Sequence, residues 1–322
     1  MNKRLLNRRQ FSLRCAAFGL SFPALSAQLA AQTTAQVPGA GAASKPAAGS
    51  VKFPDGTTVP PLGQGCWHLG QGRHPLAVEE EALRTGISHG MTLIDTSGNY
   101  GNGRSEQFIS HVIAEQRDRI FLVSKVEGNQ VLGDGIARAC AASLARLGSE
   151  YLDLYLLHWP VPSTQFSGVV AAFEQLRAAK KIRAWGVSNF DVGQMDDLFR
   201  VPDGHRCATN QVPYSLNNRG VERDVLPWCK QHNLPLMAYS PLGGDHNLVI
   251  GNHALAQVAT THGCSPAAVA LAWVMRSGSV IAIPESGSPE HVTENAAALS
   301  IALTPQDLQA LDAAFPGPVG AT

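Results

Sequence analysis

Residues 120–158, IFLVSKVEGNQVLGDGIARACAASLARLGSEYLDLYLLH, contain one complete strand–helix–strand pattern. The two apolar runs in it, Ile120–Lys125 and Tyr151–His158, have the length of buried strands. Between them apolar residues recur at helical spacing over 136–147, and Gly148 follows where a left-handed helix cap belongs. Strands that are apolar on both faces are typical of a parallel sheet covered by helices on both sides.

The same alternation of strand and helix occurs eight times along the chain. The expected strands are Leu62–Trp67, Thr92–Asp95, Ile120–Lys125, Tyr151–His158, Ala184–Val187, Ala208–Gln211, Leu236–Tyr239 and Val280–Ile283. A hairpin around Asp55-Gly56, within Val51–Val59, precedes the first of them. This order predicts an α/β fold, a (β/α)8 TIM barrel with an N-terminal β-hairpin. The alternative is an open doubly wound sheet, but the first strand lacks the Gly-x-Gly-x-x-Gly turn and helix that usually follow in that fold.

The first 31 residues differ in character from the rest of the chain. They carry five basic residues and no acidic residue, and a weakly apolar stretch follows over 15–31. That stretch is too short and too polar to span a bilayer. The run Arg8-Arg9-Gln10-Phe11 resembles a twin-arginine leader, which exports folded proteins. The alternative is a disordered tail that stays attached.

The chain is therefore expected to have three parts. Residues 1–31 form the leader, residues 32–50 form a flexible linker rich in Ala, Gly, Pro, Thr and Ser, and residues 51–322 form the barrel. We expect a periplasmic protein, or a cytoplasmic one if the leader is not used. No membrane span is expected in the mature form, and a monomer is the expected state.

Charge and cysteine content exclude several classes of function. The whole chain has 25 basic and 25 acidic residues, and removing the leader leaves 20 basic against 25 acidic, a net charge of −5. An acidic body argues against a nucleic-acid partner, because phosphate contacts need clustered Lys and Arg. The six cysteines form no Cys-x-x-Cys pair, so no zinc or other metal site is expected, and reduced thiols are favoured over a disulfide.

Charged side chains end three neighbouring strands of the expected barrel. Asp95, Lys125 and His158 each follow an apolar run. Each alone could be a structural ion pair or a core histidine, since a charge close to the core needs a partner. In (β/α)8 barrels, however, the chemistry lies at the carboxyl ends of the strands. Three such groups on adjacent strands therefore favour a catalytic site.

Six motifs together give the sequence a family resemblance. They are Leu-Gly-x-Gly-x-Trp at 62–67, Ile-Asp-Thr-x-x-x-Tyr-Gly at 94–101, Val-Ser-Lys at 123–125, Tyr-Leu-Asp-Leu-Tyr-Leu-Leu-His-Trp-Pro at 151–160, Gly-Val-Ser-Asn-Phe at 186–190 and Ala-Tyr-Ser-Pro-Leu at 238–242. In this order they resemble the aldo-keto reductases, and the similarity extends from Val51 to Phe315. The segment 311–316 is similar to bacterial members that reduce small aldehydes such as methylglyoxal.

The resemblance implies an NAD(P)H-dependent oxidoreductase that reduces aldehydes or ketones to alcohols. It assigns proton donation to Tyr100, and Lys125 beside it is expected to lower the pKa of that phenol. Asp95 is expected to keep Lys125 charged, and His158 to orient the carbonyl oxygen of a small-molecule substrate. The substrate pocket is expected to be walled by Trp67 and Trp159, although Trp67 could equally serve only as packing at the barrel mouth.

The resemblance also implies NADPH or NADH as the cofactor. The residues that it assigns to the cofactor are Ser188, Asn189, Gln211, Tyr239, Ser240, Leu242, Glu285, Ser286, His291, Glu294 and Asn295. Family members usually have Lys in place of Glu285 and Arg in place of His291, and those cations pair with the 2′-phosphate of NADPH. A carboxylate would repel that phosphate, so we predict that strict NADPH preference is lost. The alternative is that Glu285 turns into solvent.

Two other functions fit parts of this pattern. A non-catalytic nicotinamide-binding sensor or interaction barrel would keep the cofactor residues and lose a catalytic one, but all four are present. A Schiff-base aldolase would use Lys125 as a neutral amine, which a neighbouring Asp95 opposes. The reductase is therefore the favoured function.

Overall fold

The computed structural model describes residues 49–244 and 249–318 of the chain. The predicted leader at 1–31 and nearly all of the predicted linker at 32–50 lie outside the described residues. Within the described ranges, no helix combines the length and the apolar character that crossing a bilayer requires.

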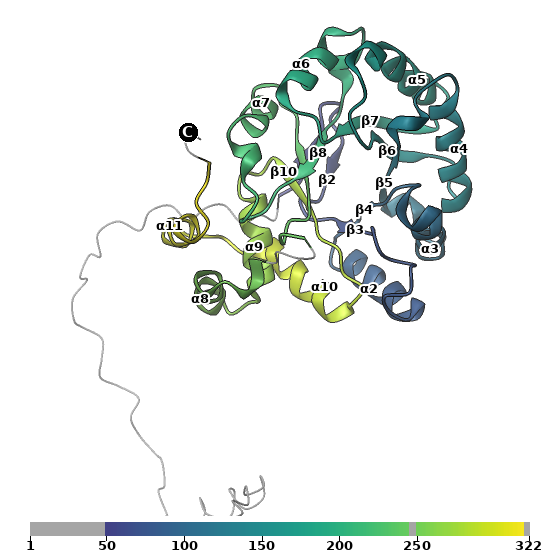
Figure 1. Ribbon diagram of the computed structural model, residues 1–322. Coiled ribbons are helices and arrows are strands. Elements are labelled where there is room, and N and C mark those ends of the chain that lie inside the picture. The colour runs from purple at the N-terminus through teal and green to yellow at the C-terminus, as the bar shows by residue number, and fades with distance from the viewer. Residues whose placement is uncertain (1–48, 245–248, 319–322) are drawn as a thin grey trace, which may run out of the picture. The chain divides into compact units, whose positions relative to one another are not determined.

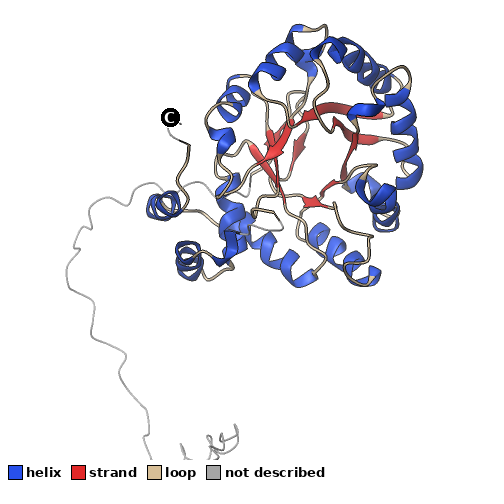
Figure 2. Ribbon diagram, viewed as in Figure 1, coloured by secondary structure: helices blue, strands red, loops and turns tan. Residues whose placement is uncertain are grey.

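Eight parallel strands form the inner ring of a barrel, and helices surround it (Figures 1 and 2). The strands are β3 (Gln64–Gly65), β4 (Leu93–Asp95), β5 (Phe121–Val126), β6 (Leu152–Leu157), β7 (Ile182–Ser188), β8 (Asn210–Pro213), β9 (Leu236–Tyr239) and β10 (Val280–Ile283). They pair in chain order from β3 to β10. Backbone hydrogen bonds from Gly63 N to Ala282 O, 2.8 Å, and from Gly65 N to Pro284 O, 2.9 Å, join the two ends of the sheet. The predicted (β/α)8 barrel is confirmed.

Helices follow the strands and cover the outside of the barrel. They are α2 (Leu76–Ser88), α3 (Arg104–Ile113), α4 (Gly135–Leu147), α5 (Phe166–Ala178), α6 (Val192–Arg200), α7 (Val225–Gln231), α8 (His253–His262), α9 (Pro266–Met275), α10 (Pro289–Ala296) and α11 (Pro305–Ala314). Local sequence sets many of their ends. The side chains of Ser265, Ser288 and Thr304 each accept a backbone N–H in the first turn, directly before a proline. Gly148 ends α4 with a left-handed φ of 61°.

The predicted hairpin is present and lies against the amino-terminal end of the barrel. Strand β1 (Val51–Lys52) pairs antiparallel with β2 (Thr58–Val59). The buried ring of Phe53 stacks on Phe121, the first residue of β5, with ring centroids 5.5 Å apart. Because the hairpin covers this end, the carboxyl ends of the strands form the open end of the barrel, where side chains from different strands meet.

Candidate active site

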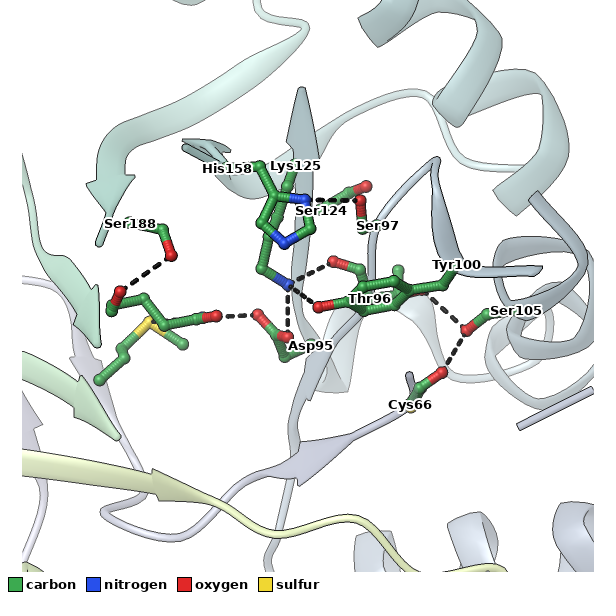
Figure 3. A network of polar contacts seen from close by, with 12 residues as sticks. Cys66, Asp95, Thr96, Ser97, Tyr100, Ser105, Ser124, Lys125, His158 and Ser188 are labelled. Atoms are coloured by element: carbon green, nitrogen blue, oxygen red, sulfur yellow. Dashed lines mark hydrogen bonds and ion pairs between the residues drawn. The ribbon is translucent and has the colours of Figure 1, made fainter. Parts of the chain in front are cut away.

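Three of the predicted catalytic groups are in direct contact at the carboxyl ends of β4 and β5 (Figure 3). The Lys125 ammonium donates to Asp95 Oδ1 at 2.6 Å, to the backbone oxygen of Thr96 at 2.8 Å and to the Tyr100 hydroxyl at 3.2 Å. Tyr100 begins the short 3-10 helix η1 (Tyr100–Gly103), which turns its ring over Lys125. The sequence motif of β4 and its following loop therefore places phenol, ammonium and carboxylate side by side.

Burial shifts the pKa of Tyr100 in a direction that the sequence did not predict. Burial raises the pKa of the Tyr100 phenol, and Lys125 lowers it only in part, so the pKa lies above 10.0. Lys125 therefore lowers the pKa of the phenol, as the sequence predicted, but burial of the ring raises it by more. Burial disfavours the Lys125 ammonium, but Asp95 and Tyr100 outweigh it and raise its pKa above 10.5. At neutral pH the site holds a charged lysine and a protonated tyrosine.

His158 completes the group from the end of β6. Its ring lies edge-on to Tyr100, with centroids 5.7 Å apart. Nδ1 of His158 lies 3.4 Å from Ser97 Oγ and is in contact with Oε1 of Glu127. Sequence reasoning missed Glu127. The signal that could have found it is strand alternation, because Glu127 comes two residues after Lys125 and so faces the same side as that catalytic residue.

A cavity of about 600 Å³ opens beside these residues, within the size range of small-molecule sites. Asp95, Tyr100 and His158 line it, together with Trp67 and Trp159. Both tryptophans expose about half of their surface, 55% and 51%. The two predicted substrate-binding residues therefore flank the opening, where the exposed part of each ring can contact a bound molecule.

Most of the predicted cofactor residues line the same cavity. These are Ser188, Asn189, Gln211, Tyr239, Ser240, Leu242, Glu285 and Ser286. The Tyr239 hydroxyl donates to Asn189 Oδ1 at 2.9 Å, and Asn189 Nδ2 donates to Ser188 Oγ at 3.0 Å. Asn189 adopts a left-handed φ of 63°, which an asparagine tolerates better than most residues do. A flat aromatic ring beside amide and hydroxyl groups fits a nicotinamide ring and its carboxamide.

Glu285 is neither turned into solvent nor without partners. Its Oε2 accepts the backbone N–H of His68 at 2.9 Å, and its Oε1 lies 2.9 Å from His68 Nδ1. His68 belongs to the loop after β3, so this contact crosses the line where β3 and β10 close the barrel. The alternative of a solvent-exposed Glu285 was therefore wrong.

Three predicted cofactor residues lie away from the lining of this cavity, on α10. His291 and Glu294 are exposed and Asn295 is buried. Their assignment to the adenosine side of a cofactor stays a prediction. Among the described residues, no group of three or more His, Cys, Asp or Glu side chains is arranged to hold a metal ion. The five cysteines in the described ranges are free thiols, as the sequence predicted.

Comparisons with known proteins agree with this geometry. Residues 61–315 match the model of the aldo/keto reductase family. Methylglyoxal reductase YeaE of Escherichia coli is 44% identical over 275 residues, which cover 84% of this chain and 96% of the relative. Glyoxal reductase of Bacillus subtilis is 32% identical over 267 residues, 82% of this chain and 92% of the relative.

A solved structure extends the agreement to three dimensions. An aldo/keto reductase of Klebsiella pneumoniae, in complex with NADP and acetate, is 44% identical and superposes with a TM-score of 0.81, covering 84% of this chain and 96% of that protein. Family model, sequence identity and superposition all extend over most of the barrel. The chain belongs to the aldo/keto reductase family.

Proposed function

We propose that this protein reduces aldehydes and ketones to alcohols with NADPH or NADH. The observation that carries the proposal is the contact of Tyr100 with Lys125, 3.2 Å, on a cavity that His158 also lines. A protonated phenol held against an ammonium is suited to give a proton to a carbonyl oxygen. Family membership and the reductase relatives support the same reaction.

Each residue of the group then has a distinct part in one balanced reaction. A reduced nicotinamide held beside Tyr239, Asn189 and Ser188 would supply a hydride to the carbonyl carbon. The C=O π electrons move to the oxygen, which takes the proton of the Tyr100 hydroxyl, and the products are an alcohol and the oxidised nicotinamide. The Lys125 ammonium, 3.2 Å away, stabilises the phenolate left on Tyr100 until solvent protonates it again. Asp95 keeps Lys125 charged and in place.

The proposed substrates are small 2-oxoaldehydes such as methylglyoxal. The names of the relatives from Escherichia coli and Bacillus subtilis, which report methylglyoxal and glyoxal reduction, support this class. Trp67 and Trp159 at the opening give the carbonyl end of such a molecule an apolar wall beside Tyr100 and His158. Small substrates would leave most of the cavity to the cofactor.

Replacing the proton donor tests the function. In Tyr100→Phe, reduction of methylglyoxal should fall by about 10²–10⁴-fold, the usual contribution of a positioned acid, while the affinity for NADPH stays within about twofold. Tyr151→Phe, directly before β6, is the matched control and should keep full activity. Cofactor binding without turnover of any carbonyl by the wild type would favour the sensor alternative. Unchanged turnover in Tyr100→Phe would refute the assignment of the donor.

We further propose that strict NADPH preference is lost. Glu285 lines the cavity, and its carboxylate is fixed by His68, so a negative charge is held at the predicted adenosine side. The aldo/keto reductase of Klebsiella pneumoniae is solved with NADP, so the opposite result is a real alternative. Dissociation constants for NADPH and NADH decide between them. NADPH binding tenfold or more tighter than NADH would contradict the proposal.

Export through residues 1–31 is proposed on the sequence pattern alone. Arg8 and Arg9 precede Phe11, and small residues follow near the end of the segment. In bacteria with a twin-arginine pathway, the wild-type chain should appear in the periplasmic fraction, and the double variant Arg8→Lys, Arg9→Lys should stay in the cytoplasm. Equal amounts of both variants in the periplasm would contradict this route of export.

A monomer is proposed for the mature protein. Analytical ultracentrifugation of the chain without the leader should give a single species of monomer mass over a wide range of concentration. A concentration-dependent rise to twice that mass would contradict the proposal.

A further inference from the structure

Glu127 contacts a catalytic residue without lining the substrate cavity. It directly follows β5 and precedes the short 3-10 helix η3 (Gly128–Gln130). Its Oε1 contacts Nδ1 of His158, and the two side chains expose 23% and 12% of their surface. His158 lines the cavity, whereas Glu127 is not among the lining residues. Any effect of Glu127 on the reaction must therefore pass through the His158 ring.

The contact determines which ring nitrogen of His158 carries the proton. An ionised carboxylate only accepts hydrogen bonds, so the nitrogen that faces Glu127 must be the donor. A neutral imidazole has one N–H. With that proton on Nδ1, the neutral ring presents a lone pair at Nε2. Ser97 Oγ, 3.4 Å from the same Nδ1, either donates or accepts and so does not favour the other tautomer.

This tautomer limits what His158 can do for a substrate. A carbonyl oxygen is an acceptor, and a lone pair at Nε2 cannot donate to it. His158 can donate to the carbonyl oxygen only when both nitrogens are protonated and the ring is positively charged. Glu127 supplies the negative charge that balances that state. The carboxylate therefore permits the charged ring and excludes the neutral ring as a donor.

The other groups around the His158 ring do not balance its charge. Tyr100 lies edge-on at 5.7 Å between centroids, and Trp159 stacks at 6.0 Å. The charge of Lys125 is already paired with Asp95, and Asn189 Nδ2 donates to the backbone oxygen of His158 rather than to its ring. Within the described ranges, Glu127 is the one charged side chain that forms an ion pair with His158.

We propose that Glu127 is a positioning residue that keeps the proton on His158 Nδ1 and makes the charged imidazolium the working donor at Nε2. Substrate is then held by two donors, the protonated ring and the Tyr100 hydroxyl. The proposal rests on the reductase function proposed above, but the tautomer is a property of the protein itself and can be measured without turnover.

The tautomer is read from ¹⁵N-labelled histidine by long-range proton–nitrogen correlation spectra. The spectra are recorded across the range in which histidines titrate, roughly pH 5 to 8. The His158 signals are identified by their absence in a His158→Gln variant. We expect the neutral ring of the wild type to carry its proton on Nδ1. A proton on Nε2 in the wild type would overturn the proposal whatever the rates are.

Kinetics of Glu127→Gln test the charge, because glutamine keeps the size of the side chain and its acceptor oxygen. We expect kcat to fall by about 10–100-fold, the range found when a partner of a working histidine is lost, with the affinity for NADPH unchanged. The neutral His158 ring of Glu127→Gln should also no longer hold its proton only on Nδ1, because a glutamine can either donate or accept there, and a packing role would not produce this change. Glu115→Gln, an exposed acid beyond α3, is the matched control and should match the wild type.

The two measurements give a clear decision. The proposal stands only if the wild type carries the proton on Nδ1 and Glu127→Gln loses at least about tenfold in kcat with an unchanged thermal midpoint. A kcat of Glu127→Gln within about twofold of the wild-type value would show that Glu127 only packs against His158. A wild type that turns over no carbonyl would end the reductase function, and the spectra would still show which nitrogen of His158 carries the proton.

Discussion

Gln211 donates from Nε2 to Oδ2 of Asp95 at 2.8 Å, across the interior of the barrel from β8 to β4. The other oxygen of this buried carboxylate accepts from Lys125 at 2.6 Å. Both oxygens of Asp95 are therefore fixed by the protein. The resemblance assigned Gln211 to the cofactor amide, and the contact with Asp95 leaves its carbonyl oxygen for that purpose. Gln211 thus links the predicted cofactor residues to the catalytic ones.

Removing that amide should destabilise the fold as well as the site. In Gln211→Leu, Oδ2 of Asp95 loses its donor while it stays buried, which costs about 1–3 kcal/mol. Urea denaturation of the variant measures the change in the free energy of unfolding. Gln107→Leu, on the exposed face of α3, is the control and should change stability by less than about 0.5 kcal/mol. Equal stability of the two variants would show that the bond contributes nothing.

The Lys125–Asp95 pair allows stability to be separated from activity. Lys125→Met leaves Asp95 as a buried charge without its cation, which should cost about 3–5 kcal/mol. Adding Asp95→Asn removes the charge and should restore most of that stability, but not turnover, because the phenolate still lacks an ammonium. Urea denaturation and methylglyoxal assays on the single and double variants check this. Recovery of activity in the double variant would contradict the role of Lys125.

The same pair has a pH signature with a defined sign. The pKa of Lys125 is raised above 10.5 in the folded protein, so the pair stabilises the fold below that pH. That stability is lost as pH rises through the folded pKa. The free energy of unfolding of the wild type should therefore fall more steeply with alkaline pH than that of the double variant. Parallel curves for the two proteins would contradict the raised pKa.

Much of this site follows from sequence because strand ends in a parallel barrel meet at one end. Asp95, Lys125 and His158 each follow an apolar run, and closure of the barrel alone brings them together. The direction of the Tyr100 pKa could not be predicted, because it depends on how deeply the loop after β4 buries the phenol. Sequence motifs predict which groups lie next to one another. The direction of a pKa shift also depends on burial, which only the packing of the folded chain determines.

Contacts made by loops could not be predicted from the sequence either. Glu285 was expected either to repel the 2′-phosphate of NADPH or to turn into solvent, and its contact with His68 was not predicted. The conformation of the loop after β3 determines that contact, and no periodic pattern marks it. Glu127 differs, because its place two residues after Lys125 was readable. Its partner was not, since the contact depends on the rotation of the His158 ring.

Asp153 should be a main determinant of stability at the opposite end of the barrel. Its carboxylate, 3% exposed, accepts from Arg117 and Arg183 at 2.8 Å each and from Leu122 N at 2.9 Å. Asp153→Ala leaves the largely buried Arg117 without its anion, and we expect a loss of about 3–5 kcal/mol in urea denaturation. Arg183→Ala is the matched control: that side chain is 64% exposed, so its loss should cost no more than about 1 kcal/mol. Similar costs for both would contradict this reading.

Glycines in the barrel wall and on the helical surface should respond oppositely to the same methyl group. A Cβ at Gly186, in β7, would lie 2.6 Å from the backbone oxygen of Thr209 and 2.9 Å from Leu156 Cδ2, which belongs to the neighbouring strand β6. Neither strand can move without breaking its ladder, so Gly186→Ala should cost about 1–3 kcal/mol. Gly168, exposed in α5, has no atom within 4 Å of its added Cβ. There alanine restricts the unfolded chain and suits a helix, so Gly168→Ala should add about 0.5–1 kcal/mol. Thermal and urea denaturation of both variants measure the difference, and a loss at Gly168 or a gain at Gly186 would contradict the packing described for β7.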